Sequence, residues 1–362
     1  MSMLNFTVGP VMTDPRILEI SGQSSPYFRN AEFSTIMFEN EKLMLEFMKA
    51  PKDSRCVFLT TSGTGAMESC VINLLKNKDK VLVINGGSFG KRFVEMCVIH
   101  HKNFTEIPVE FGHQIKSEQL QQFVGQGYTA LLVNMGETSS GTVYDMNLIS
   151  NFCKQNGIML IVDAISAFIA DEVDMTQFCA AAVITGSQKA LAVHPGISVI
   201  VLAPEALKRV EENENACMYL SMKQALNNAE RGQTPFTPAV TTLLEINKRL
   251  HIIKDEGGIE KSHDKIVALA MEFRLAIKDM PFDFVSESPS NAVTALHPQK
   301  VTATFIIEML KREYDIWICP NGGELADKVF RVGHIGYITP EDNKKLIVAF
   351  RDLYERNLLS SI

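Results

Sequence analysis

Near the middle of the chain, residues 182–189 read Ala182-Val183-Ile184-Thr185-Gly186-Ser187-Gln188-Lys189, a short apolar run followed at once by a polar segment that ends in a lysine. Further apolar runs flank this stretch, separated by segments long enough to form helices. All are continuous rather than alternating, as expected for strands buried on both faces of a mainly parallel sheet. They span residues 81–84, 130–133, 159–162 and 199–202. The pattern predicts an α/β fold.

Polar or glycine-rich segments follow these runs, at residues 85–88, 134–141, 163–164 and 185–189. In an open parallel sheet, ligands bind at the carboxyl ends of the strands, where loops and helix N-termini meet. The functional site is therefore expected at this edge of the sheet.

The size and charge of the chain exclude several classes of protein. Its 362 residues, at roughly 150 residues per domain, suggest two domains. There are 35 Lys and Arg against 42 Asp and Glu, and a net charge of −7 without a basic block argues against a nucleic-acid-coating protein. The apolar runs are far shorter than the roughly 20 residues of a transmembrane helix, so we expect no membrane span.

The cysteines and the termini bear on metal binding and location. Seven cysteines are scattered without a CxxC or Cys/His metal spacing, so we expect reduced thiols and no metal site. Neither terminus resembles a targeting signal, and we expect a cytoplasmic protein.

Beyond residue 202 the chain becomes more helical and more polar, and then returns to a βα pattern. Helices are expected over residues 204–214, 218–231, 240–251, 265–277, 301–311 and 340–357, and short strands over 282–284, 293–296, 317–319 and 329–331. The sequence Asp255-Glu256-Gly257-Gly258 indicates a hinge. We predict a large domain over residues 16–255 and a small domain formed by residues 1–15 and 256–362.

Three polar features stand at the predicted sheet edge. Lys189 can act as a Schiff-base nucleophile if it is neutral, although a single loop lysine is more often only solvated. Asp163 closes the run 159–162, where a carboxylate can also be a helix cap. Residues 60–66, Thr-Thr-Ser-Gly-Thr-Gly-Ala, form either a phosphate cradle before a helix or an ordinary turn. Together, a lysine for an aldehyde, an acid for a pyridinium nitrogen and a phosphate cradle suit pyridoxal phosphate.

The chain resembles the class V aminotransferases of the fold-type-I pyridoxal-phosphate group, among them the alanine–glyoxylate, serine–pyruvate and 2-aminoethylphosphonate–pyruvate enzymes. The resemblance covers essentially the whole chain in order and spacing. The matching segments are residues 6–10, 61–68, 136–141, 162–164, 186–191, 195–196, 234–238 and 330–336. The resemblance implies pyridoxal 5'-phosphate as cofactor, and a large domain with a mainly parallel sheet joined to a smaller α/β C-terminal domain.

The same resemblance implies roles for residues at both ends of the cofactor. Lys189 corresponds to the Schiff-base lysine, and Asp163 to the acid that pairs with the pyridine nitrogen and makes the ring a better electron sink. The residues that correspond to the phosphate end are Ser62, Gly63 and Thr64, assisted by Gln188.

Other matching positions concern the ring face and the second subunit. Phe89 corresponds to the aromatic residue that stacks on the pyridine, and Thr138 to a hydroxyl residue near the phenolic oxygen and the substrate. Thr237 corresponds to a residue that the relatives contribute to the neighbouring subunit's phosphate site, which implies a homodimer with shared active sites.

The resemblance also implies which residues bind the substrate. Arg331 corresponds to the arginine that holds the substrate carboxylate by a planar two-bond fork. Gly9, in the first matching segment, is also assigned to the substrate site. Arg29 is either a second anion contact or part of a structural ion pair.

The implied function is ping-pong transfer of an amino group from alanine, serine or 2-aminoethylphosphonate to pyruvate or glyoxylate. Cysteine desulfurases share this fold and need a reactive cysteine on a mobile loop. Cys319 is the only candidate in that region, but it lies in an apolar strand-like run, where burial would raise its pKa. A non-catalytic regulatory protein or a sugar-binding module is disfavoured by the joint presence of Lys189, Asp163 and Arg331.

Overall fold

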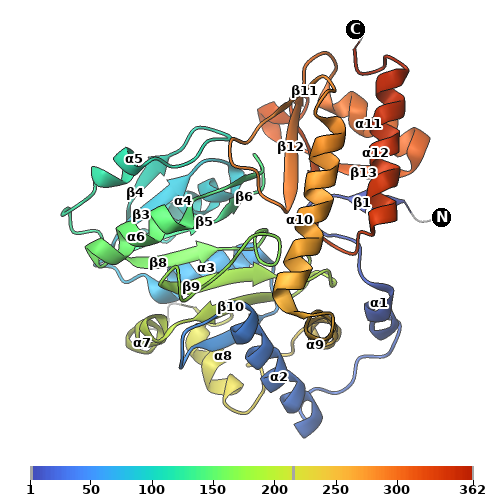
Figure 1. Cartoon of the computed structure of the whole chain (residues 1–362). Coiled ribbons are helices and arrows are strands. Elements are labelled where there is room, and N and C mark those ends of the chain that lie inside the picture. The colour runs from blue at the N-terminus through green and yellow to red at the C-terminus, as the bar shows by residue number, and fades with distance from the viewer. Residues whose placement is uncertain (1–2, 214–216, 361–362) are drawn as a thin grey trace.

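Two main β-sheets organise the protein, for which a computed structural model describes residues 3–213 and 217–360 (Figure 1). The larger sheet has seven strands in the order β2-β10-β9-β8-β5-β3-β4, and β10 alone runs antiparallel to its neighbours. Its strands are β2 (Arg55–Leu59), β3 (Lys80–Asn85), β4 (Asn103–Pro108), β5 (Ala130–Asn134), β8 (Met159–Asp163), β9 (Ala180–Gly186) and β10 (Ser198–Leu202). Strands β5, β8, β9 and β10 are buried along their whole length, which explains their continuous apolar sequences.

The smaller sheet has five strands in the order β1-β13-β14-β12-β11. Its strands are β1 (Leu4–Phe6), β11 (Phe282–Phe284), β12 (Val293–Pro298), β13 (Ile316–Pro320) and β14 (Phe330–Gly333). Because β1 pairs in parallel with β13, the start of the chain lies in the same sheet as residues near its end. A short hairpin, β6 (Gly136–Glu137) with β7 (Thr142–Val143), follows β5.

Helices cover the two sheets and join them. They are α1 (Pro15–Ser21), α2 (Ala31–Phe47), α3 (Gly63–Leu74), α4 (Ser88–Ile99), α5 (Ser117–Gln121), α6 (Met146–Asn156), α7 (Pro204–Glu212), α8 (Met222–Ala229), α9 (Val240–Asp255), α10 (Gly258–Ile277), α11 (Ala303–Tyr314) and α12 (Pro340–Glu355), with a 3-10 turn at Gly323–Leu325. Figure 1 shows α10 running from beside α9 up to the smaller sheet. Within the described residues, no helix is both long and apolar enough to cross a membrane.

The structure confirms the α/β class and the expected strands, and it corrects several helix ends. Helix α10 begins at Gly258 rather than at residue 265, because its first two turns are polar and carry no apolar periodicity. Helix α8 begins at Met222 rather than at residue 218, behind a Ser221 cap. Helix α7 ends at Glu212, and the expected end at residue 214 lies outside the described residues. Gly257, at φ +106°, separates α9 from α10 at the expected hinge.

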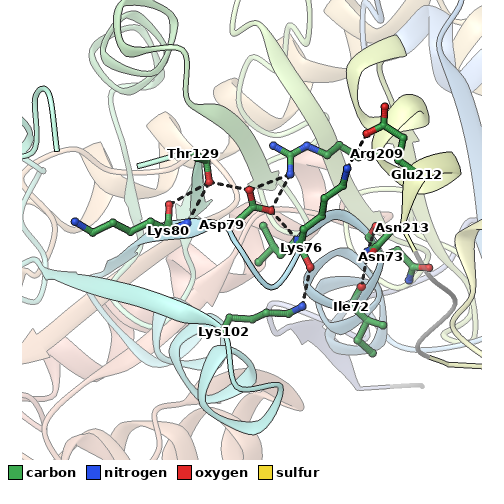
Figure 2. A network of polar contacts seen from close by, with 11 residues as sticks. Ile72, Asn73, Lys76, Asp79, Lys80, Lys102, Thr129, Arg209, Glu212 and Asn213 are labelled. Atoms are coloured by element: carbon green, nitrogen blue, oxygen red, sulfur yellow. Dashed lines mark hydrogen bonds and ion pairs between the residues drawn. The ribbon is translucent and has the colours of Figure 1, made fainter. Parts of the chain in front are cut away.

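The edge of the large sheet where β3 and β5 begin is held together by a buried carboxylate, Asp79 (Figure 2). Arg209 on α7 donates hydrogen bonds of 3.0 and 2.7 Å to its two oxygens, and the hydroxyl of Thr129 donates one of 2.9 Å. Burial acts to raise the pKa of Asp79, but these bonds and one from the Lys76 amide outweigh it and lower the pKa. This network is structural, since the functional edge of a parallel sheet is the opposite one.

Candidate active site

Lys189 lies three residues beyond the end of β9, and its side chain is buried. Its Nζ donates a hydrogen bond of 2.5 Å to the carbonyl oxygen of Val8. Burial lowers the pKa of this lysine to about 8, and the positive charge of Arg331 acts in the same direction. The amine is therefore neutral in an appreciable fraction near neutral pH, as a Schiff-base nucleophile requires. The solvated-lysine interpretation is excluded by this burial.

The N-terminal segment passes directly over this lysine. Gly9 has a φ of +117°, and a Cβ built on it would lie 2.8 Å from Cδ of Lys189. A larger residue would therefore meet both an unfavourable backbone angle and the lysine side chain. The close approach explains why the first matching segment carries a glycine here.

Asp163 closes β8 and is buried. Its Oδ1 accepts a hydrogen bond of 2.8 Å from the backbone N–H of Ile165. Burial raises the pKa of the carboxyl group to about 7, while the bond from Ile165 opposes the rise. The segment that directly follows Asp163 is a turn and not a helix, so the helix-cap interpretation is wrong. Among the described residues the carboxylate accepts only the bond from Ile165, which leaves it able to receive a cationic group.

The start of helix α3 lies against this same turn. A Cβ built on Gly63 would lie 2.3 Å from Cδ1 of Ile165, so only glycine permits the approach. Ser62 occupies the N-cap position without a side-chain cap hydrogen bond. The backbone N–H groups of Gly63 and Thr64 have no acceptor among the described residues. Such unpaired amides at a helix N-terminus are able to bind a phosphate.

These groups fit pyridoxal phosphate. Lys189 supplies an amine of lowered pKa, Asp163 supplies a buried acid, and the first amides of α3 are available for a phosphate. The Lys189 and Asp163 charges influence each other's pKa, and Gly63 contacts the turn that follows Asp163. The three features that the sequence placed on separate strands therefore lie in one region.

Phe89, at the second position of α4, is only partly buried, so it is not an ordinary core residue. Its backbone N–H donates to the buried carboxylate of Glu137 at 3.2 Å, and that of Gly90 donates at 3.0 Å. The side chain of Asn134 donates to the same carboxylate at 2.9 Å. A carboxylate at this end of the helix also suits the helix dipole. Glu137 thus fixes the start of α4 and, with it, the position of Phe89.

Arg92 links Phe89 to the start of α3. Its guanidinium lies 4.6 Å from the centre of the Phe89 ring and donates a hydrogen bond of 2.8 Å to Oγ1 of Thr64. The cation also acts to lower the pKa of both Asp163 and Lys189. The aromatic ring and the amide cradle are thereby held in a fixed relation.

Arg331 lies at the side of the site that faces the smaller sheet. One Nη donates to the carbonyl oxygen of Thr138 at 3.2 Å, and the other donates to the Pro320 carbonyl at 2.6 Å and to Cys319 Sγ at 3.2 Å. Its Nε is buried and has no hydrogen-bond partner among the described residues. The charge of Arg331 also lowers the pKa of Lys189, so a guanidinium with an unused donor lies within electrostatic range of the lysine.

The structure does not bring every expected residue to this group. Arg29 donates to the carbonyls of Thr234 and Pro235, at 2.8 and 3.2 Å, and makes no ion pair with any residue that the structure describes. Thr237 is exposed and borders a surface depression with Tyr219. Gln188 is partly buried in the turn before Lys189 and makes no described hydrogen bond to the α3 amides. The roles of Arg29, Thr237 and Gln188 stay predictions.

The expectation that Cys319 is buried is wrong. Strand β13 alternates between buried and more exposed positions, and Cys319 lies on its more exposed side against Arg331. It belongs to a paired strand and not to a loop, which still separates it from the cysteine that a desulfurase requires.

Sequence reasoning missed Arg92, Glu137 and the Val8 carbonyl. Arg92 could have been found, because it stands three residues after Phe89 on a helix and so shares its face. Glu137 stands inside a matching segment, but nothing in the sequence shows that its carboxylate reaches the start of α4.

The fold and the site define an enzyme that uses pyridoxal phosphate. The family model for class V aminotransferases matches residues 19–329, and the chain belongs to this family. This enzyme is therefore a pyridoxal-phosphate-dependent aminotransferase of class V.

Known relatives are similar to this chain over most of its length. The chain is 29% identical to the soluble hydrogenase 42 kDa subunit of Anabaena cylindrica, over 87% of this chain and 83% of that protein. It is 26% identical to the L-aspartate–glyoxylate aminotransferase of Paracoccus denitrificans, over 78% and 74% of the two chains. The structure of the ureidoglycine–glyoxylate aminotransferase of Bacillus subtilis superposes with a TM-score of 0.92 at 21% identity, over 100% of this chain and 95% of that one. That likeness supports the fold.

Proposed function

We propose that the enzyme moves an amino group from a small donor, namely alanine, serine or 2-aminoethylphosphonate, to pyruvate or glyoxylate in two half-reactions. The observation that carries the proposal is that Lys189 and Arg331 lie within electrostatic range of each other. A buried amine with a pKa of about 8 lies within electrostatic range of a guanidinium whose buried Nε has no partner. The first group can move a proton at the donor carbon, and the second can hold a carboxylate.

When bound, pyridoxal phosphate supplies an aldehyde for the donor's amino group and a ring that accepts the electron pair left at the carbon. Asp163 would pair with the ring nitrogen, and the amides of Gly63 and Thr64 would hold the phosphate. Phe89, whose backbone N–H is held by Glu137, would lie against the ring. The Lys189 amine can take a proton from the donor carbon as a general base and give it back as a general acid.

Arg331 orients the substrate through a charge-assisted, planar contact with its carboxylate. The lysine amine donates a hydrogen bond of 2.5 Å to the Val8 carbonyl in the N-terminal segment. This carbonyl holds Nζ where it can be released toward a substrate. The neighbouring Gly9 has no side chain, and a Cβ there would lie 3.1 Å from Nζ.

The proposal includes a homodimer with shared sites and a cytoplasmic location, together with the division into a large and a small domain. Support for the dimer comes from Thr237, which is exposed beside the stacked rings of Tyr219 and Phe236, 5.5 Å apart. An exposed, rigid edge of this kind suits contribution to a second subunit. Sedimentation measures the subunit count directly. A monomer at micromolar concentration with full activity would contradict shared sites.

The donor is identified by single-turnover spectra of the cofactor-loaded enzyme with alanine, serine, 2-aminoethylphosphonate and aspartate, each at equal concentration. The true donor converts the cofactor spectrum fastest, and pyruvate or glyoxylate restores it. Cysteine is added as a separate arm, with sulfide measured. Release of sulfide at the rate of the best amino transfer would favour the desulfurase alternative, with Cys319 as the nucleophile.

A further inference from the structure

A cavity of about 650 Å³ lies between helices α1, α9 and α10 and the segment that follows β14. Its polar lining includes Asp14, Arg16, Arg249, Glu256, Lys265 and Glu272. None of these residues belongs to the active site described above. The cavity nevertheless adjoins it, because Ala190, the neighbour of Lys189, is part of the wall. Residues 336–340, which follow the strand that carries Arg331, also belong to the wall.

Arg249 is the unusual member of this lining. Its side chain is partly buried, and burial lowers its pKa. Its Nε is buried without a hydrogen-bond partner, and no hydrogen bond or ion pair of Arg249 occurs within the described residues. A guanidinium that lines a cavity, is partly withdrawn from water and has no ion pair can bind an anion that enters the cavity.

The carboxylates nearest to Arg249 are already occupied. Asp14 forms an ion pair of 2.6 Å with Arg16, whose guanidinium also reaches Glu256 at 2.8 Å. Glu256 accepts a second ion pair of 2.8 Å from Lys265. Asp14 and Glu256 act on Arg249 only at longer range, by charge. Within the described part of the chain, Arg249 is therefore the one cation of this lining that no ion pair uses.

The lining also limits the class of ligand. The three carboxylates of the lining, from Asp14, Glu256 and Glu272, are balanced by its three cations, from Arg16, Arg249 and Lys265, so the cavity offers no net positive charge to a doubly charged phosphate. A single carboxylate matches the one free guanidinium and can accept two parallel hydrogen bonds from it. The apolar side chains of Ile266 and Leu269 suit a hydrocarbon or aromatic body attached to that carboxylate.

We propose that this cavity is a second ligand site, which takes a small organic monocarboxylate on Arg249 beside the active site. It is separate from the substrate site, because its anion contact comes from α9 and not from β14. The inference does not depend on which amino donor the enzyme uses.

The test is titration calorimetry of the cofactor-loaded enzyme with sodium benzoate, a monocarboxylate with an apolar body. The variants are Arg249→Met, Arg331→Met and, as a matched control, Arg351→Met on the exposed side of α12. Arg249→Met should weaken benzoate binding by about tenfold or more, because a charge-assisted contact is lost. Arg331→Met and Arg351→Met should retain this binding event, and inorganic phosphate should bind more weakly than benzoate.

Thermal unfolding without benzoate provides a second readout. Removal of a partly buried charge that has no ion pair should leave the melting temperature of Arg249→Met equal to or above that of the wild type. Benzoate should raise the melting temperature of the wild type and not that of Arg249→Met. Failure of Arg249→Met to fold, benzoate binding that only Arg331→Met abolishes, or preference for phosphate would each overturn the proposal.

Discussion

The amine of Lys189 and the carbonyl oxygen of Val8 are 2.5 Å apart, although the two residues are separated by 181 positions in the chain. The contact joins the large sheet to the segment that follows β1 of the smaller sheet. Lys189 is therefore held by the N-terminal segment on one side and influenced by Arg331 of β14 on another. The site is formed where the two sheets meet.

Lys189→Ala should keep the fold but lose the covalent bond to the cofactor. Transamination should fall by several orders of magnitude, because the variant lacks both the amine that binds the aldehyde and the group that moves the proton. The measurement is single-turnover conversion of alanine or serine, with circular dichroism to confirm folding. Lys345→Ala, which removes an exposed lysine, is the control and should remain at wild-type rate. Near-normal turnover by Lys189→Ala would remove this lysine from the mechanism.

The lowered pKa of Lys189 predicts a pH dependence of cofactor capture. A lysine of pKa about 8 loses its proton well below the ordinary value of 10.5, so the reactive neutral form increases as pH rises and is half-populated near pH 8. The rate at which the apoenzyme captures pyridoxal phosphate, trapped with borohydride and measured by mass, should level off just above pH 8. Lys189→Ala should show no adduct at any pH. A rate that still climbs steeply toward pH 10 would show an unshifted lysine.

Much of this site could be predicted from sequence because it depends on strand ends. Lys189 and Asp163 follow apolar runs, and the carboxyl ends of parallel strands meet at one edge, so their proximity follows from topology. The contact to Val8 could not be predicted, because it depends on how the chain start returns to pair with β13. The burial of Cys319 was predicted wrongly for a related reason. An apolar run does not show which face of a strand is covered by the rest of the protein.

Asp163→Asn should weaken cofactor binding and slow proton removal from the donor, because the cationic ring nitrogen loses its carboxylate. The control is Asp145→Ala at the N-cap of α6, where Asp145 accepts hydrogen bonds of 2.9 and 3.1 Å from backbone amides. That variant should lose about 1 kcal/mol of stability and keep its activity. If Asp163→Asn behaved like the control, with activity per folded molecule intact, the carboxylate would have no role at the ring.

The pH dependence of the apoprotein's stability gives a second test of Asp163. Burial raises its pKa to about 7 from an ordinary value of 3.8, so the folded state binds more protons than the unfolded state between these values. The contribution of this group to stability is therefore present at low pH and is lost as pH rises toward 7. The wild-type apoprotein should lose stability relative to Asp163→Asn over this range, as measured by urea unfolding. A constant difference between the two proteins would contradict the raised pKa.

Glu137→Gln should loosen Phe89. The amide cannot present two acceptor oxygens to the N–H groups of Phe89, Gly90 and Ser139, so at least one donor loses its partner. We expect a loss of about 2 kcal/mol in stability, as for a buried group left unsatisfied, and weaker cofactor binding. Equilibrium dialysis of the cofactor with Glu137→Gln and Glu106→Gln, an exposed control on β4, separates the two effects. Unchanged cofactor affinity in Glu137→Gln would assign the carboxylate to folding alone.

Arg331→Lys tests whether Arg331 binds the carboxylate of the substrate. An ammonium cannot reproduce the planar fork of a guanidinium, so the variant should lose about 1.5 to 3 kcal/mol, roughly 10- to 150-fold in kcat/KM for oxo acids. The reaction with an uncharged amine should be almost unaffected, because it makes no carboxylate contact. Arg312→Lys, at an exposed position on α11, serves as the control for the substitution itself. If Arg331→Lys handled pyruvate and glyoxylate as well as the wild type, Arg331 would be a structural link among Thr138, Cys319 and Pro320, and Arg29 would be the next candidate.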